Sequence, residues 1–485
     1  MRLIDIPAIL KDRRGSEINL IDKTIMGIEL DSRNVQAGYL FVAIQGTNSD
    51  GHQFIDEAIQ NGVIAVVGEM DLEKELPIPY FQVKDSRVAL GQLAAFFYQY
   101  PSGKHKVIGV TGTNGKTTTS YLIRHILQSV GRTCSLIGTV SNIINNKTIT
   151  SSNTTPDAIQ LQRLLFESND EFVIIEVSSH ALNQSRTEGI RLDFALFTNL
   201  SHDHLDYHHN MNDYYYEKKK IFKLLKDEGE SIINVDNEWG KLLARELDES
   251  IPQSLVGSDG EYLIGNIQMN GQTSFTVQHL GKNYKILLPL QGIHNINNAA
   301  MAFVTSLRIG LKPEQIRAAL ARFSGVPGRF ESVFNEHGAR FVVDYAHTKD
   351  AFEYCLQTAK YQKANNIYHI FGFRGGRDRS KREDMIRVSA KYSDLFILTM
   401  DDLNEESKED MLEDLRAFHG SFPNGQVIPD RTLAIQTLWE IAEEGDWIFI
   451  TGKGPERYKS HFQLGTDCDI DTLNYLKGSN DETHK

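Results

Sequence analysis

The loop VTGTNGKTTTS carries the strongest chemical signal in the sequence, because it joins an apolar run at 107–110 to a segment with helical character. Gly112 and Gly115 allow the backbone to turn sharply and to aim N–H groups at phosphate. Lys116 can meet the β/γ oxygens, and Thr117 can ligate magnesium. The pattern predicts a nucleotide phosphate loop of the short TGTNGKTT form, since Val110 stands where a Walker A loop has its first glycine. The alternative, a glycine-rich turn that only caps a helix, is disfavoured by the preceding strand.

Acidic and histidine residues follow two further apolar runs. Glu176 ends FVIIE, where a second acidic residue completes magnesium coordination in phosphate-loop enzymes. A strand-end glutamate without any role is the alternative. In TNLSHDHLDYHH, Asp203 and His204 are candidate neighbours of metal or phosphate. The surface is the expected place for most of the others, which are His202, Asp206, His208 and His209.

The basic run EKKKIF at 217–222 has two interpretations. By composition it is the solvated face of a helix. A lysine close to magnesium can instead form a carbamate, an anion that is able to hold metal. Spacing within the run does not choose between them.

The elements that must position these residues indicate an α/β protein with mainly parallel strands and a second βαβ array after residue 330. Strands are predicted at 38–44, 62–68, 107–110, 172–177, 194–200, 231–235, 340–345, 366–373, 394–400 and 446–452, and helices at 88–100 and 158–166. The pattern breaks on Pro, Ser and Gly at 101–106, which indicates a domain boundary. Ligands bind at the carboxyl ends of parallel strands. We therefore expect one edge to gather Asp344, His347, Arg374, Arg377, Asp401, Asp402, Lys453 and Glu456.

Composition excludes several classes of protein. The 485 residues are 40% hydrophobic and 24% charged, which fits a globular chain of about three domains. The net charge of −13 disfavours nucleic-acid binding through a basic surface and favours small ligands. Three separated cysteines, Cys134, Cys355 and Cys468, indicate neither a disulfide framework nor a zinc site, which fits a reducing cytoplasm. Without a signal-peptide core or a long apolar run, we expect a cytoplasmic protein that makes no use of a membrane.

Taken together, the motifs resemble the Mur ligase family over essentially the whole length. The segments that carry the resemblance are 31–62, TGTNGKTTT, SNTTPD, EVSSHALNQSR, TNLSHDHLDYH, GIHNINNAAMA, GVPGRFE, DYAHT and GKGPE. The first of them distinguishes the chain from other Mur ligases and from folylpolyglutamate synthetases. The resemblance implies a UDP-substrate domain at 1–104, an ATP-binding domain at 105–326, and a Rossmann-like domain at 327–485 that brings the amino acid.

The resemblance also implies an activity. An ATP-dependent amide ligase would add a diamino acid, such as lysine or diaminopimelate, to UDP-N-acetylmuramoyl-L-alanyl-D-glutamate in peptidoglycan synthesis. The substrate carboxylate attacks the γ-phosphate to give an acyl phosphate and ADP, and the amine then displaces phosphate. Closure of the C-terminal domain would exclude water. Monomer is the default of the family.

Site residues are carried over by position. The resemblance implies that the catalytic residues would be Lys116, Glu176, His204 and Lys218, with Lys218 at the carbamate position, and that the metal ligands would be Thr117, Glu176, His204 and Lys218. ATP would contact Gly112, Thr113, Asn114, Gly115, Lys116, Thr117, Thr118, Asn295, Arg329 and Asp344. The UDP-muramoyl-dipeptide would contact Ser32, Asn153, Thr154, Thr155, Ser178, Gln184 and Arg186.

The expected amino-acid pocket departs from the family. Its residues would be Arg377, Asp401, Asp402, Asn404, Gly452 and Glu456. Diaminopimelate-adding members have Asp-Asn-Pro-Arg where this chain has DDLN, so Asn404 replaces a guanidinium that would grip a distal carboxylate. The two aspartates can favour a substrate ammonium or form a solvated turn. Arg377 keeps the α-carboxylate position, whereas Pro455 and Lys349 replace the usual histidine and proline.

The sequence leaves two other functions open. One is the same ligase chemistry in a dedicated pathway, with another amino acid or acceptor, which the unusual pocket favours and the intact N-terminal motif disfavours. The other is a non-catalytic nucleotide-binding scaffold, which the retained Lys116, Thr117, Glu176, His204 and Lys218 disfavour.

Overall fold

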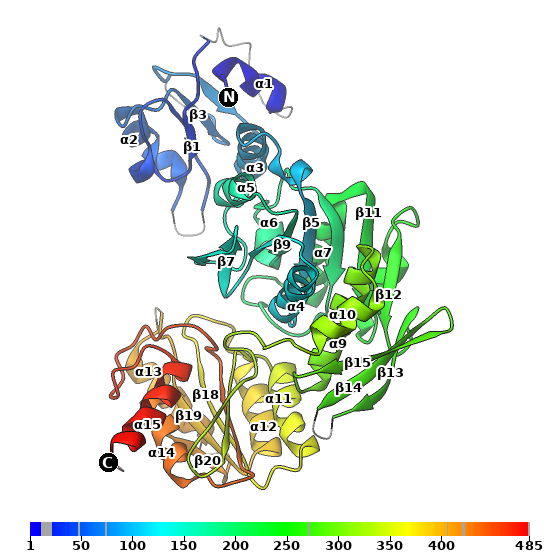
Figure 1. Ribbon diagram of the computed structural model, residues 1–485. Coiled ribbons are helices and arrows are strands. Elements are labelled where there is room, and N and C mark those ends of the chain that lie inside the picture. The colour runs from blue at the N-terminus through cyan, green and yellow to red at the C-terminus, as the bar shows by residue number, and fades with distance from the viewer. Residues whose placement is uncertain are drawn as a thin grey trace. The chain divides into compact units, whose positions relative to one another are not determined.

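The computed structural model describes residues 1–10, 22–46, 49–72, 75–269, 272–404, 406–419 and 422–483 (Figure 1). They form two compact units. The first contains Met1–Gly109, Thr133–Ala195 and Glu217–Gly229, and the second contains Val110–Arg132, Leu196–Tyr216 and Glu230–Lys485. Strands β5 (Lys106–Thr111) and β10 (Leu192–Phe197) carry the chain from the first unit into the second.

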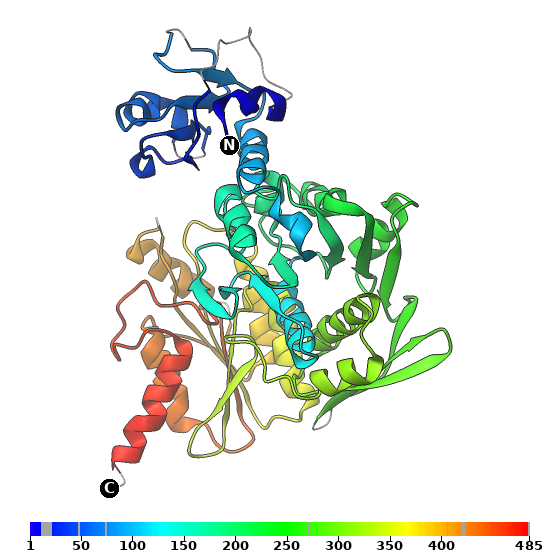
Figure 2. The same cartoon turned by 45° about the horizontal axis from the view of Figure 1, so that its top comes forward.

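The first unit begins with a small parallel sheet (Figures 1 and 2, blue). Its order is β1 (Gly27–Glu29), β2 (Tyr39–Val42), β3 (Ala65–Gly68) and β4 (Tyr80–Gln82). Helix α2 (Ile55–Gln60) lies between β2 and β3 in sequence, and α3 (Ser86–Phe97) follows β4. The Asp85 carboxylate caps α3 by accepting hydrogen bonds from two backbone N–H groups. The predicted strands and helix of this region are confirmed.

The rest of the first unit pairs four strands in the order β9 (Phe172–Glu176), β6 (Cys134–Ile137), β7 (Ser141–Ile144) and β8 (Lys147–Thr150). Only β6 and β9 are parallel; the other two pairs are antiparallel. Helix α5 (Ala158–Glu167) packs against α3, and the short helix α6 (Ser179–Asn183) follows β9. The strand and the helix predicted here are confirmed.

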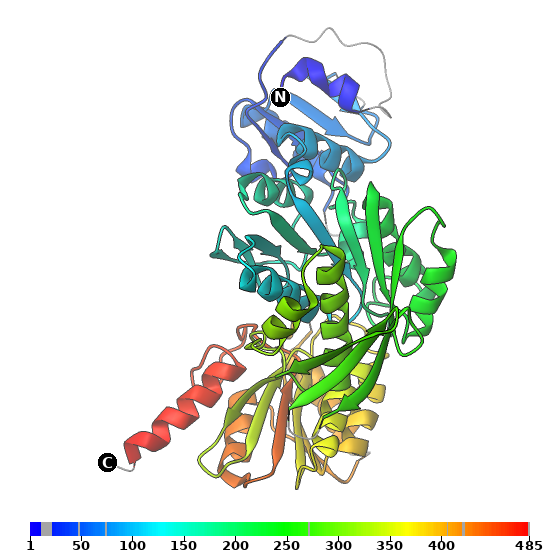
Figure 3. The same cartoon turned by 45° about the vertical axis from the view of Figure 1, so that its right-hand side comes forward.

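The second unit contains the helices α4 (Lys116–Ser129), α9 (Ile293–Arg308) and α10 (Pro313–Leu320), which pack on one another. Strand β11 (Leu225–Asn234) pairs in parallel with β12 (Gln253–Gly257), and β12 with β13 (Tyr262–Gln268). Strands β14 (Thr273–His279) and β15 (Lys282–Leu288) continue antiparallel, as the long green arrows of Figures 1 and 3. The mainly parallel arrangement predicted for 106–325 is confirmed, with antiparallel pairs towards the ends of the strand order. Leu280 and Gly281, both with positive φ, form a tight turn that reverses the chain.

The C-terminal part of this unit is a six-stranded sheet (Figure 3). The order is β16 (Glu331–Phe334), β17 (Arg340–Asp344), β21 (Trp447–Thr451), β18 (Ile367–Phe373), β19 (Leu395–Met400) and β20 (Gly425–Val427). All pairs are parallel except β16 with β17. The four predicted strands form its centre, so their carboxyl ends meet at one edge as expected.

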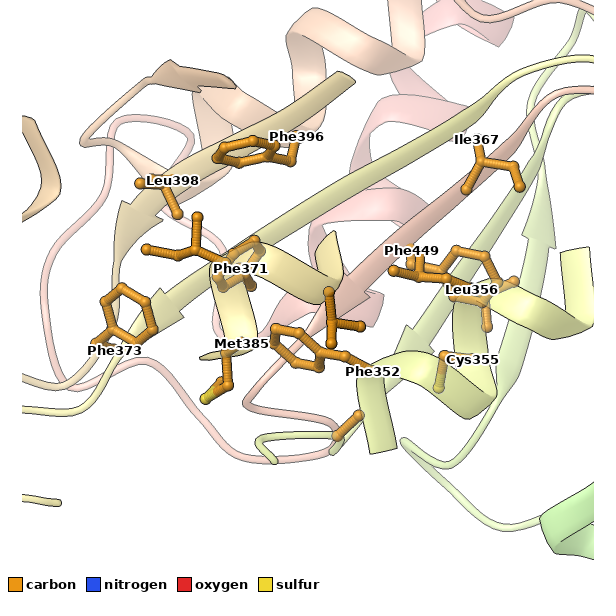
Figure 4. Packing of buried hydrophobic residues seen from close by; sticks show 14 of the residues in the cluster. Phe352, Cys355, Leu356, Ile367, Phe371, Phe373, Met385, Phe396, Leu398 and Phe449 are labelled. Carbon is orange, nitrogen blue, oxygen red and sulfur yellow. The ribbon is translucent and has the colours of Figure 1, made fainter. Parts of the chain in front are cut away.

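Both faces of this sheet are buried, which explains why its strands are continuous apolar runs. Along β18, Phe371 faces the cluster formed with α11 (Lys349–Tyr361), α12 (Arg382–Tyr392) and α13 (Lys408–His419), as Figure 4 shows with Phe352 and Met385. Ile370 faces the opposite cluster with α14 (Arg431–Ile441) and α15 (Asp469–Thr483). Across the described residues, no helix is both long enough and apolar enough to cross a membrane. The predicted α/β fold class is confirmed.

Candidate active site

The phosphate loop lies between β5 and α4, and both of its glycines are required by the geometry. Gly112 has φ +145°, and a Cβ there would lie 2.0 Å from the Thr198 hydroxyl. Gly115 has φ +87°, and its Cβ would lie 2.3 Å from the Asn298 amide oxygen. The N–H groups of Thr113 and Asn114 donate to Asn199, each at 2.9 Å. The loop is thus held in one conformation from outside, as a preorganised phosphate site requires.

The cation and hydroxyls of the loop lie at the start of helix α4. The Lys116 ammonium donates to the carbonyls of Gly112, at 2.8 Å, and Thr113, at 3.0 Å, so it is folded over the loop. Thr117 and Thr118 are buried in the first turn. Because the positive end of the helix dipole adds to this charge, the arrangement suits an anionic phosphate chain.

A cavity of about 310 Å³ opens beside the loop. Its walls include Asn114, Gly115, Thr118, Asn234, Asp236, His294, Asn295, Asn298, Arg329, Phe330, Asp344, Tyr345 and Tyr354. The structure thereby brings together residues predicted from three distant segments. Asn295 donates to the Gln291 carbonyl at 2.8 Å, and its side-chain oxygen accepts from Asn298 at 3.3 Å.

His294 is a cavity residue that the sequence reasoning did not single out, although it stands inside GIHNINN. Burial lowers its pKa and keeps the imidazole neutral, with Asp344 acting weakly in the opposite direction. Its ring lies 5.8 Å from that of Tyr354 and 6.3 Å from that of Phe330. Within the described ranges, its buried Nδ1 has no hydrogen-bond partner. A flat heteroaromatic ligand such as a nucleobase fits this environment.

Arg329 and Asp344 bring opposite charges to the cavity. Arg329 donates to the Thr117 hydroxyl at 3.3 Å, and its guanidinium lies 4.4 Å from the centre of the Tyr345 ring. Its buried Nε makes no hydrogen bond to any described residue. Asp344 accepts from the N–H groups of Phe330 and Ala346, each at 2.7 Å. The carboxylate therefore fixes the loop that carries Arg329, and the guanidinium keeps a donor for an anion.

A second cavity, of about 110 Å³, is built around the buried carboxylate of Asp203. Asp203 faces Lys381 at 3.0 Å, His347 at 3.3 Å and His204 at 3.4 Å. Burial would raise the pKa of Asp203, but His204, His347 and Lys381 together hold it well below its usual range. The buried Asp203 carboxylate thus holds the Lys381 ammonium and the His204 and His347 imidazoles in place.

The expectation that most of the neighbouring polar residues lie at the surface is confirmed. His202, Asp206 and His209 are exposed. His208 is the one of the four that is buried. Its ring stacks on Tyr214, with 5.0 Å between centroids, which removes the imidazole from water.

The second cavity gathers some of the residues predicted for the amino-acid pocket at the strand ends. The second cavity is lined by Arg374, Arg377, Asp401 and Gly452, and Tyr345, His347 and Lys381 also line it. Arg377 is half-exposed and lies 3.8 Å from Asp206. Asp402, Asn404 and Glu456 are not among the lining residues. Asn404 has φ +50° and donates to the Gly375 carbonyl at 2.8 Å.

The paired aspartates are buried, so the alternative of a solvated turn is wrong. The Lys453 ammonium, itself 1% exposed, lies 2.8 Å from Asp402 and 3.3 Å from Asp401. Burial opposes ionisation, yet Lys453, Arg431 and Arg374 lower the pKa of Asp401. The Lys453 ammonium therefore occupies the place beside Asp401 and Asp402 where a substrate ammonium was one of the expectations.

The residues predicted to hold the muramoyl-peptide lie near the end of β9 in the first unit. The Thr155 hydroxyl donates to the Glu176 carbonyl at 2.8 Å and accepts from the Ser178 N–H at 3.0 Å. Arg186 donates to the Thr155 carbonyl at 2.8 Å and, through two nitrogens, to the Gln184 side chain. These hydrogen bonds fix four of the predicted residues as one cluster.

Thr139 extends this cluster, and the sequence reasoning missed it. Its hydroxyl lies 2.8 Å from the Glu176 carboxylate and 3.1 Å from the Thr154 hydroxyl. Asn153 is exposed, and its carbonyl accepts from Ser151 at 2.7 Å. Thr139 lies just after β6, far from any recognised motif, so no local signal pointed to it.

Two further predicted residues of the first unit are buried. The Ser32 hydroxyl donates to the Glu57 carboxylate at 2.6 Å, within the N-terminal sheet region. Lys218 lies in the last turn of helix α7 (Met211–Lys219) and is 1% exposed, whereas Lys220 is partly exposed and pairs with Glu217 at 2.7 Å. The solvated-face interpretation therefore fails for Lys218 and describes Lys220.

The oxygen donors beside the phosphate loop suit magnesium. No described group of three His, Cys, Asp or Glu residues is placed to hold a metal. Mg²⁺ in nucleotide sites commonly takes only one or two protein oxygens and completes its shell with phosphates and water. A hydroxyl such as Thr117 in the first turn after a phosphate loop fits that kind of site.

Comparisons with known proteins agree with this geometry. Residues 24–98 match the Mur ligase family catalytic domain, 110–306 the Mur ligase middle domain, and 328–454 the Mur ligase glutamate ligase domain. The chain is 38% identical to a UDP-N-acetylmuramoyl-L-alanyl-D-glutamate--2,6-diaminopimelate ligase of Fusobacterium nucleatum, over 93% of this chain and 92% of the relative. It is 40% identical to the protein of that name in Aquifex aeolicus, over 91% of each chain.

Solved structures show the same similarity. A ligase of that name is 27% identical, with TM-score 0.68 and 99% of both chains covered. MurF ligase from Thermotoga maritima in complex with ADP is 19% identical, with TM-score 0.63, 88% of this chain and 94% of that chain covered, and shares the fold.

Proposed function

Because the chain belongs to the Mur ligase family, we propose that it is an ATP-dependent ligase joining 2,6-diaminopimelate to UDP-N-acetylmuramoyl-L-alanyl-D-glutamate in peptidoglycan synthesis. The observation that carries the proposal is the reach of Arg329 to Thr117 at the phosphate loop. A guanidinium at that position can stabilise the charge of a transferring phosphoryl group, which favours phosphoryl transfer over simple nucleotide binding. The names of the relatives supply the acceptor and the amino acid.

The proposed reaction has two steps. In the first, the D-glutamate carboxylate attacks the γ-phosphorus of ATP, the bond to the bridging oxygen breaks, and ADP leaves. Lys116 and Arg329 offset the charge that collects between these anions. In the second, the amino group attacks the acyl carbon, phosphate leaves, and the amine loses a proton. Glu176, His204 and Lys218 are proposed to serve the first step.

The proposal includes magnesium. Thr117, Glu176, His204 and Lys218 are the residues proposed to hold it, the last as a carbamate. When bound, the ion would neutralise phosphate charge.

Domain roles and substrate contacts are part of the same proposal. Residues 1–104, with Ser32, are proposed to hold the UDP part, 105–326 the ATP, and 327–485 the amino acid. The Thr155 cluster, with Asn153 and Thr154, is proposed to hold the muramoyl-peptide.

The test is incubation of the purified protein with ATP, Mg²⁺ and the UDP-muramoyl-dipeptide, together with each of diaminopimelate, lysine, ornithine and other amino acids. Phosphate release and product mass are measured, and Lys116→Met serves as the inactive control. A tripeptide product that contains diaminopimelate in the wild type supports the proposal.

Absence of product with every amino acid refutes the proposal. The DDLN segment and Pro455 favour the second candidate, a ligase of a dedicated pathway. A product formed only with another acceptor would establish that candidate.

A further inference from the structure

The unusual pocket contains acids that the protein already neutralises. Lys453 pairs with Asp401 and Asp402. Glu456 accepts a hydrogen bond from the Tyr345 hydroxyl at 2.9 Å, and its other oxygen pairs with Arg374. A substrate ammonium arriving at these carboxylates would have to compete with buried partners, which is costly.

Most cations around the same cavity are also committed to protein acids. Lys381 lies 3.0 Å from Asp203. Arg382 is buried and pairs with Asp414 at 2.6 Å and with Glu406 at 3.1 Å. These contacts hold the loop after β18 in place. Two further guanidinium groups lie at the cavity and could bind a ligand.

Arg374 and Arg377 are those two groups, and both line the cavity. Arg374 stands directly after β18, and its side chain is 24% exposed. Its contacts to Glu456 and to the Gly452 carbonyl use Nη2 alone. Among the described residues, none accepts a hydrogen bond from its Nε or Nη1. The guanidinium lies 5.6 Å from the centre of the Tyr345 ring, which limits its orientation.

Asn404, which stands where diaminopimelate-adding relatives are expected to have arginine, does not line this cavity and is tied to Gly375. We propose that Arg374 replaces that arginine and binds the side-chain carboxylate of the incoming amino acid, while Arg377 binds its α-carboxylate. Arg374 is then the residue that selects an amino acid with a second carboxylate over lysine or ornithine. This inference rests on the proposed function and names the residue that sets its substrate class.

The physical basis is the pairing of a guanidinium with a carboxylate. An arginine offers parallel N–H groups that match both oxygens of a carboxylate, and such charge-assisted hydrogen bonds are strong. The side chains of lysine and ornithine have no carboxylate, so these amino acids would leave the Arg374 donors unpaired in a partly buried site.

The test measures kcat and KM for diaminopimelate and for lysine with wild type, Arg374→Gln and Arg374→Lys. We expect the wild type to prefer diaminopimelate. Arg374→Gln should lower kcat/KM for diaminopimelate about 10- to 100-fold, mainly through KM, and change that for lysine less than about threefold. Arg374→Lys keeps the charge, so its kcat/KM for diaminopimelate should lie between that of the wild type and that of Arg374→Gln. The matched control is Arg387→Gln, an exposed arginine on α12.

Three results would overturn the inference. The first is a wild type that forms product with lysine in preference to diaminopimelate, which leaves the ATP-dependent ligase activity intact but contradicts diaminopimelate as its amino acid. The second is an equal loss for both amino acids in Arg374→Gln, which would mean that Arg374 only positions Glu456. The third is an Asn404→Arg variant that gains preference for diaminopimelate while Arg374→Gln loses none. A wild type without any tripeptide product refutes the proposed function and this inference with it.

Discussion

Replacement of Arg329 by alanine tests the role of the guanidinium at the phosphate loop. In the structure its Nη2 lies 3.3 Å from the Thr117 hydroxyl, and its buried Nε has no described partner. In the proposed function, these donors face the charge that develops on the transferring phosphoryl group. Removal of one preorganised donor at such a position costs about 3 to 4 kcal/mol of transition-state stabilisation.

That cost converts to a loss of kcat of about 100- to 1,000-fold, at about 1.4 kcal/mol for each factor of ten. KM for ATP should rise much less, because Lys116 and the positive end of helix α4 still bind the ground state. Arg329→Lys retains the charge but not the planar donors, so its loss should be smaller than that of alanine.

The assay is steady-state phosphate release at saturating acceptor and amino acid, with ATP varied. Arg322→Ala is the control, since Arg322 is exposed and its Nε donates only to the local Ala318 carbonyl. If kcat in Arg329→Ala stays within threefold of wild type while KM for ATP rises, the residue binds ATP without acting in phosphoryl transfer. That result would refute the reasoning.

Three further predictions concern stability and metal. Burial, with a smaller contribution from Arg431, lowers the pKa of His369 to about 3, so the unfolded chain binds more protons between about pH 3 and 6.5. Stability should therefore fall with falling pH in that window by about 1 kcal/mol per unit, and urea titrations should show a shallower fall in His369→Gln. Asp469→Asn leaves the fully buried Arg431 unpaired and should cost about 3 to 5 kcal/mol in urea unfolding, whereas Glu383→Gln at an exposed pair should cost less than about 1. Chelation with EDTA should abolish phosphate release and excess Mg²⁺ should restore it; activity that persists after chelation would contradict the proposed magnesium role.

The sequence by itself determined those features that neighbouring residues encode. The phosphate loop was evident because its two glycines, lysine and threonine lie within six residues, between a strand and a helix. The central C-terminal strands were evident because burial of both faces makes each an unbroken apolar run. Their parallel order then implied that the strand-end residues would share one edge, and the structure brings His347, Arg374, Arg377 and Asp401 together around one cavity.

Tertiary structure decided which of those residues pair with one another. Nothing near Asp401 and Asp402 in sequence showed that Lys453, about fifty positions later, would neutralise them, or that Asn404 would turn toward Gly375. The antiparallel pairing of β14 and β15 could likewise not be predicted from the sequence, because alternating polar and apolar residues do not specify strand direction. Electrostatic pairing and strand register depend on distances between segments remote in sequence, so only the folded chain fixes which charges remain for a ligand.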